Sequence, residues 1–108
     1  MEDYQKGSIV FDHAVDIVRK WDEVGRGVSP FGIMRVMHIG YVMAMDIMDE
    51  LCENHIIRME FTKHDDGEDG IKYHIITKEE LAKKFPDEQW YLPKHESNFD
   101  YDLAKETI

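Results

Sequence analysis

The chain has little cysteine, no long apolar run and few cations. Each of these shortages argues against a class of protein. Its 108 residues contain one cysteine, Cys52, so no intramolecular disulfide can form, and we expect a reducing, cytoplasmic location. The longest nearly uncharged stretch, residues 36–45, is far shorter than the roughly 20 residues that a membrane helix needs. The first eight residues are polar and acidic, so we expect no signal peptide and no membrane partner.

Positive charge is scarce throughout. There are 13 Lys and Arg against 23 Asp and Glu, which gives a formal net charge of −10. A field of this sign repels nucleic acid at long range and attracts basic protein surfaces. An equally open interpretation is that the acidic residues only keep the chain soluble. Because 43% of the residues are hydrophobic, a chain of this length can build one core without disulfides.

Apolar residues at helical spacing predict three helices in the first half of the chain, over residues 8–24, 30–37 and 41–54. Ser8 is a plausible N-cap of the first helix, and its polar residues, Asp12 among them, are expected on the solvent face. Ser followed by Pro at residues 29–30 is a strong helix start. Glycines separate the three segments.

The apolar period then changes to two. Residues 56–62 and 71–76 are predicted to be strands, and the acidic, glycine-containing loop between them makes a β-hairpin. Residues 77–80 (TKEE) form a capping box that opens a short helix ending at Phe85. The order helix, short helix, turn, helix, hairpin predicts an α+β winged helix, in which the hairpin is the wing.

The expected organisation is a winged-helix domain over residues 1–86 and a C-terminal arm or tail over residues 87–108. The arm is polar with aromatic positions. Trp90 and Tyr91 could anchor it back onto the domain, or the arm could bind a partner, and the sequence leaves both alternatives open.

Two stretches carry a family resemblance. Residues 10–18 (VFDHAVDIV) and 38–48 (HIGYVMAMDIM) resemble the L-Y-D-x-A-V-x-I-V helix and the R-I-G-Y-N-R-A-A-R-I stretch of the gamma domain of FtsK/SpoIIIE DNA translocases, and residues 55–57 take the strand-entry place. The resemblance covers roughly residues 9–57. It implies a winged helix whose third helix reads short oriented DNA sequences in the major groove.

The resemblance does not extend to the DNA-reading residues. The family reads DNA with an Asn and two Arg after the I-G-Y turn, and those positions here are Val42, Met43 and Asp46. The chain also has no G-x-x-x-x-G-K-[ST] loop, so the ATPase motor of the family is not expected. The resemblance therefore implies the family's fold without its recognition chemistry.

Both elements that would face a duplex are acidic. Residues 40–53 contain no Lys or Arg, and phosphate contacts normally need such cations. Carboxylates occur instead, in the third helix and in the hairpin loop: Asp46, Asp49, Glu50, Glu53, Asp65, Asp66, Glu68 and Asp69. Five cations elsewhere could overturn this argument by forming one positive strip: Arg19, Lys20, Arg26, Arg35 and Arg58.

Flexible apolar side chains occupy positions at which the family has polar, DNA-reading residues. Methionine is common on adaptable protein-binding surfaces. We therefore predict that the third helix and the wing dock on a protein partner with a basic surface. The predicted partner-binding residues are Tyr41, Val42, Met43, Met45, Asp46, Asp49, Glu50, Asp65, Asp66, Glu68 and Asp69.

A sharper form of this hypothesis is that the acidic face imitates DNA and blocks a nucleic-acid-binding protein, as short acidic phage inhibitors do. Three alternatives stay open. In the first, the methionines belong to the core and the acidic residues only solvate a face. In the second, the chain binds double-stranded DNA like its apparent relatives. In the third, the apolar helix joins two copies into a homodimer.

No enzymatic, cofactor or metal site is expected. The six histidines match no zinc spacing, and the acidic loop, including His64, lacks the spacing of a calcium loop. Asp12, His13 and Asp16 form an acid–base pattern without a pocket to act on. Carboxylates beside Cys52 are expected to raise its pKa and make it a poor nucleophile.

Overall fold

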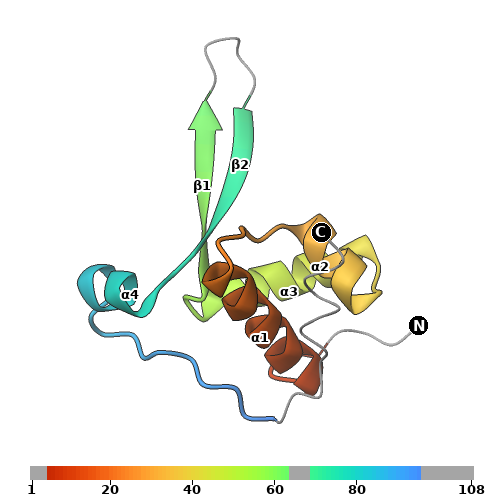
Figure 1. Cartoon of the computed structure of the whole chain (residues 1–108), viewed down its shortest axis with the longest axis horizontal. Coiled ribbons are helices and arrows are strands. Elements are labelled where there is room, and N and C mark those ends of the chain that lie inside the picture. Colours follow the sequence, from red (N-terminus) through yellow and green to blue (C-terminus); the bar gives the residue numbers. More distant parts are fainter. Residues whose placement is uncertain (1–4, 64–68, 96–108) are drawn as a thin grey trace.

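The described part of the chain is an α+β domain. The computed structural model describes residues 5–63 and 69–95, and within them it contains four helices and one two-stranded antiparallel sheet (Figure 1). The helices α1, α2 and α3 gather into one layer, and the hairpin of β1 and β2 projects from it, with α4 at the foot of the hairpin. The α+β class and the element order predicted from the sequence are confirmed.

Side-chain caps set the starts of three helices. The helix α1 spans Ile9–Glu23, and the Ser8 hydroxyl accepts a hydrogen bond from the Phe11 N–H. The helix α2 spans Pro30–Met37, where Ser29 accepts from the Gly32 N–H. Each cap satisfies one N–H that the first helical turn leaves without a partner.

The other two helices begin differently from each other. The helix α3 spans Tyr41–Glu53 and follows Gly40, which supplies no capping side chain. The helix α4 spans Lys78–Lys84, and the Thr77 hydroxyl accepts from the Glu80 N–H, as the capping box predicts. Between α2 and α3 the backbone of His38 is left-handed, with φ of 55°. This residue ends α2 and turns the chain into α3.

The core lies between α1, α2, α3 and the foot of the hairpin. Trp21 and Phe11 are the largest buried side chains of α1, and Ile33 and Ile47 are buried opposite them on α2 and α3. Complete burial of side chains of this size stabilises the fold by roughly 1.5–3 kcal/mol each. The same core extends to Ile57 at the start of the hairpin, which fixes the hairpin on the helical layer.

The hairpin strands lie one to two residues nearer the tip than their side-chain pattern predicted. The strands β1, Ile57–Lys63, and β2, Asp69–Ile75, pair antiparallel from Ile57 opposite Ile75 to Lys63 opposite Asp69. The prediction ended β1 at residue 62 and began β2 at residue 71. Backbone pairing continues past the last apolar residues because the ladder needs only N–H and C=O groups.

The chain beyond α4 returns along α1. Residues 87–95, which we call the C-terminal segment, leave α4 and run beside α1 (Figure 1). The ring of Tyr91 meets the ring of Phe11 edge to face, with 5.3 Å between their centroids. The guanidinium of Arg19 lies 4.1 Å from the centroid of the Trp90 ring. Trp90 and Tyr91 therefore anchor the C-terminal segment onto the domain, which is one of the two alternatives that the sequence left open.

No single helix in the described ranges is both long enough and apolar enough to cross a membrane. The pair α2 and α3 reaches such a length and composition only when taken together, and the two helices are bent by 117° at the turn between them.

Candidate functional site

The outer face of α3 holds most of the residues predicted to bind a partner. Val42 is 76% exposed and Tyr41 is 50% exposed, while Asp46 and Asp49 are also exposed. Met45 is half-buried on the same helix. Residues one turn apart share a helix face, so Tyr41 and Met45 lie on one flank, and Val42, Asp46 and Asp49 lie farther out.

Two of the predicted residues do not belong to this face. Glu50 is only 4% exposed, and its carboxylate accepts a hydrogen bond of 2.9 Å from the Gly7 N–H. The expectation of an exposed Glu50 is therefore wrong, because the segment before α1 covers that flank of α3. Met43 is half-buried and packs against the core. Both residues serve the packing of α3 rather than its outer face.

The acidic loop cannot be placed in the same way. Asp65, Asp66 and Glu68 lie outside the described residues. Asp69 is described by its backbone alone, where it begins β2. Whether these four carboxylates contact a partner stays a prediction from the sequence.

The hairpin carries an apolar face that the sequence analysis did not assign to the site. Directly opposite residues of an antiparallel pair share a face, and so do residues two apart on a strand. Met59 lies opposite Tyr73, and Phe61 lies opposite Ile71. Phe61 is 73% exposed, and Met59 and Ile71 are about half exposed at 47% and 53%. The alternation of residues 57–61 was the available signal, but it was used only to predict a strand.

The apolar faces of α3 and the hairpin adjoin each other at Tyr73. This tyrosine packs against the core, and its pKa is raised, first by burial and then by the proximity of Cys52, Tyr41 and Asp49. Those three residues belong to α3, so Tyr73 lies within electrostatic range of α3, and both elements pack on the same core. The Tyr41 ring in turn lies against the Phe31 ring of α2, with 5.9 Å between centroids.

We call this surface the apolar strip. It runs from α2 across α3 to the hairpin and consists of Phe31, Tyr41, Val42, Met45, Met59, Phe61, Ile71 and Tyr73. The exposed carboxylates of α3 border it. Exposed apolar side chains gathered on neighbouring elements are typical of sites that bind another molecule.

Three of the five cations that could have formed a positive strip are engaged with other side chains. Arg19 stacks on Trp90, and Lys20 pairs with Glu23 at 3.3 Å. Arg58 lies on the polar face of the hairpin and pairs with Glu80 at 2.8 Å. Arg26 is half-buried in the loop between α1 and α2, and Arg35 is exposed on α2, one turn beyond Phe31.

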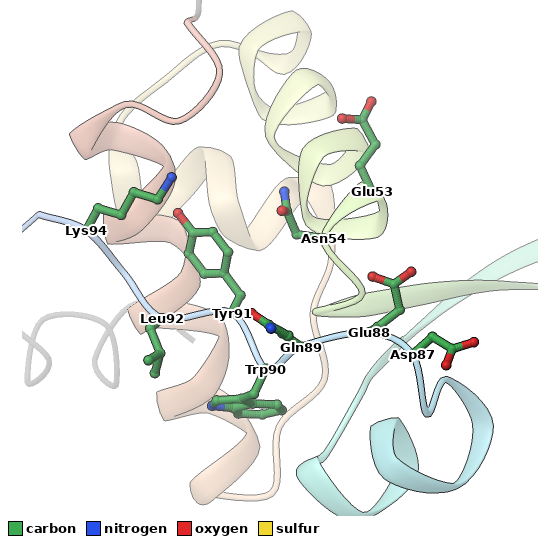
Figure 2. Close-up of a pocket in the computed structure, with 9 residues that line it drawn as sticks. All are labelled: Glu53, Asn54, Asp87, Glu88, Gln89, Trp90, Tyr91, Leu92 and Lys94. Atoms are coloured by element: carbon green, nitrogen blue, oxygen red, sulfur yellow. The ribbon is translucent and has the colours of Figure 1, made fainter.

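A groove lies on another side of the molecule, between the end of α3 and the C-terminal segment. Its volume is about 610 Å³, and it is lined by Glu53, Asn54, Asp87, Glu88, Gln89, Trp90, Tyr91, Leu92 and Lys94 (Figure 2). Glu53 pairs with Lys6 at 3.0 Å, and Glu88 lies 3.6 Å from His55. Two of its three carboxylates therefore already face cationic or ionisable groups of the chain itself.

The C-terminal segment is held by a carboxylate that was expected on the solvent face. Asp12 of α1 is 0% exposed, so that expectation is wrong. Its Oδ1 accepts from the Tyr91 hydroxyl at 2.6 Å. Its Oδ2 accepts from the backbone N–H groups of Lys94 and His95, both at 2.9 Å, and lies 2.6 Å from Nδ1 of His95. We call these contacts the Asp12 clamp.

The clamp also sets the acidity of its members. Burial alone raises the pKa of Asp12, but the hydrogen bonds from Tyr91, His95 and Lys94 outweigh it, so the pKa lies below the ordinary value of 3.8. Burial, together with the hydrogen bond to the carboxylate, raises the pKa of the Tyr91 hydroxyl. At neutral pH the clamp is therefore an ionised carboxylate held by a neutral phenol and backbone donors.

Two observations concern the histidine, carboxylate and cysteine side chains of the described ranges. No group of three or more His, Cys, Asp or Glu side chains there is arranged to hold a metal ion. Burial, followed by the nearby carboxylates of Asp49 and Glu53, raises the pKa of Cys52. The predicted direction of that shift is confirmed, and it keeps the thiol protonated at neutral pH.

Comparison with known proteins finds no relative of this chain. No protein-family model matches the chain, and neither a curated protein nor a solved structure matches it.

Proposed function

We propose that this chain is a non-catalytic winged-helix module that docks on a protein partner through the outer face of α3 and the hairpin. One observation carries the proposal. The face that would enter a DNA groove holds the exposed carboxylates Asp46 and Asp49 beside the apolar strip, and no cation occurs in residues 40–53. The element order and the resemblance to the FtsK/SpoIIIE gamma domain support the winged-helix assignment.

Electrostatics favour protein over DNA as the partner. Binding to duplex DNA draws much of its affinity from cations that replace the counterions of the phosphates. Two exposed carboxylates at the docking face, Asp46 and Asp49, oppose that exchange, and the paired Arg58 cannot supply it without losing Glu80. Burial of exposed side chains such as Val42 and Phe61 favours an apolar partner surface instead, at about 25 cal/mol per Å².

A more specific form of the proposal concerns nucleic-acid machinery. A basic protein that normally binds phosphates would also attract the carboxylates of α3. The chain would then compete with nucleic acid for that protein, as an inhibitor or DNA mimic. Duplex DNA binding by the chain itself is the second candidate, and the exposed Arg35 beside Phe31 is the observation that favours it.

A mobility-shift assay with mixed-sequence duplex at low salt separates the two candidates. We expect no shift at micromolar wild-type protein. The double variant Val42→Arg with Asp46→Arg should bind the duplex, and added salt should weaken that binding. The matched control is Val24→Arg with Asp22→Arg, which makes the same change in charge at exposed positions near the end of α1.

The outcomes are distinct. Salt-sensitive wild-type binding at micromolar concentration or below would refute the protein-docking proposal in favour of DNA binding. Equal gains for the two double variants would show that only net charge matters and that α3 is not the docking face. The partner itself is sought by affinity capture from the native host, where Val42→Asp should lose a basic protein that Val24→Asp retains.

A further inference from the structure

We infer that the apolar strip receives a cationic amphipathic segment of the partner, with apolar side chains on the hairpin face and Lys or Arg against the carboxylates of α3. This inference rests on the proposed function and names the partner's chemistry. It also places the main contact on the apolar face of the hairpin, whereas the sequence pointed to α3 and the acidic end of the wing.

The hairpin has the amphipathic pattern that such a contact needs. One face carries Met59, Phe61 and Ile71, while the other pairs Arg58 with His74 and Glu60 with Lys72 across the strands. The apolar face continues into the core at Ile57, so its inner end is fixed by packing. The outer end is the most exposed, where the Phe61 side chain stands 73% accessible. A fixed base and an exposed aromatic are typical of the energetically dominant contacts of an interface.

The charges beside the apolar strip favour a bound segment of positive charge. Asp46 and Asp49 are exposed on α3, and Asp46 lies one turn after Val42 of the apolar strip. These carboxylates attract Lys or Arg across an interface and repel an acidic surface. Arg58 and Lys72 are on the opposite face of the hairpin, whereas Lys63, paired with Asp69 at the outer end, continues the register of the apolar face. An apolar surface with an acidic border and half-buried methionines is the chemistry that accepts basic amphipathic segments.

A second copy of the chain fits the strip less well. Each copy carries a formal net charge of −10, to which the four carboxylates within residues 64–69 contribute. Pairing two hairpins through their apolar faces would bring together two chains of this charge and the exposed carboxylates of their α3 helices. Like charges at an interface cost several kcal/mol, so the cationic partner is favoured.

Three synthetic helix-forming peptides test the inference by fluorescence anisotropy. The first has a leucine face and a lysine face, the second replaces every lysine by glutamate, and the third replaces every leucine by serine. We expect the full chain to bind the leucine–lysine peptide at least tenfold more tightly than either of the others. Binding should weaken only partly with salt, because apolar burial remains.

Variants of the chain locate the contact. Phe61→Ser should weaken binding of the leucine–lysine peptide about tenfold, while the control Leu92→Ser should change it less than twofold, since Leu92 is equally exposed, at 71%, on the C-terminal segment. Asp49→Asn should weaken binding about twofold to threefold at low salt, and the exposed Glu79→Gln of α4 should not. Both test positions are solvent-exposed, and circular dichroism checks that each variant keeps its fold.

Four results would overturn the inference: no binding of the leucine–lysine peptide, equal binding of the serine–lysine peptide, equal losses for Phe61→Ser and Leu92→Ser, or concentration-dependent dimers that Phe61→Ser abolishes. None of them refutes the proposed function, which fails instead if the wild type binds duplex DNA. If the chain binds neither the duplex nor the peptide, the protein-docking proposal stands and the inference of a cationic segment is refuted.

Discussion

The Asp12 clamp gives the sharpest prediction about stability, because one substitution removes its charge with almost no change in shape. In Asp12→Asn, the amide oxygen can take the place of Oδ2 and still accept from the N–H groups of Lys94 and His95. The amide NH₂ then faces the Tyr91 hydroxyl, which can turn to accept a hydrogen bond. The variant therefore keeps most of the contacts while losing the negative charge that strengthens them.

The magnitude follows from the number of donors. A hydrogen bond to a charged group contributes about 1.5–3 kcal/mol and a neutral one about 0.5–1.5 kcal/mol. Four donors surround Asp12, from Tyr91, Lys94 and His95, so the loss of charge removes about 4 kcal/mol of gross stabilisation. Burying a neutral amide instead of a carboxylate returns part of it. We expect the free energy of unfolding to fall by about 2–3 kcal/mol.

Thermal and denaturant unfolding measure this change. A loss of that size lowers Tm by about 10 °C in a domain of this length. The control is Asp16→Asn, one turn along the same helix and only half-buried, which should change the unfolding free energy by less than about 0.5 kcal/mol. Trypsin adds a local readout, because cleavage after Lys94 requires the C-terminal segment to detach, so Asp12→Asn should be cut faster. Equal melting temperatures for the two variants would refute the clamp.

Three further predictions follow from the same structure. The pKa of Asp12 is lower in the folded than in the unfolded chain, so its ionised carboxylate stabilises the fold fully above the unfolded pKa near 4. This stabilisation is lost as the pH falls through the lower folded pKa. Thermal melts from pH 6 to 3 should therefore show the Tm values of the wild type and Asp12→Asn converging. Gly32→Ala should lower the unfolding free energy by about 1 kcal/mol in denaturant titrations, because the new Cβ would lie 3.1 Å from the buried Trp21 ring; an unchanged midpoint would contradict that packing. His38→Gly should raise Tm by a few degrees, since glycine accepts the left-handed φ of 55° without strain, and a lower Tm would count against this end of α2.

The helices and the hairpin were predictable because their signals are local. Ser8, Ser29 and Thr77 each accept a hydrogen bond from an N–H three residues later, so the sequence around each cap contains the whole interaction. The predicted bounds of α1, α2 and α3 agree with the structure within a residue or so. Assignment as a winged helix needs the angles between these elements as well, and no local pattern supplies them.

The burial of acidic residues was not predictable in the same way. Asp12 and Glu50 lie on flanks of their helices that look polar by helical periodicity. Each is buried by a segment distant in the sequence: Asp12 by residues 91–95 and Glu50 by Gly7. Periodicity describes only the side of a helix that faces the main core. The aromatic pair at residues 90–91 was the available signal that something would cover α1.

The candidate site was predicted in part. The outer face of α3 could be found because its residues adjoin one another in the sequence. The contribution of the hairpin could not, since it depends on which of its two faces continues the core. The register that sets Phe61 opposite Ile71, and the approach of Tyr73 to α3, decide this. A shift of one residue in that register would have turned the apolar face to the other side.

The Asp12 clamp also bears on the order in which the chain can reach its final form during synthesis. The carboxylate belongs to α1, whereas its donors at residues 91–95 are made about 80 residues later. A nascent chain that has already packed α1, α2 and α3 therefore still exposes one side of α1 to water. The C-terminal segment covers that side only once residues 91–95 are made, so a product terminated before residue 91 would leave the Asp12 carboxylate without these donors.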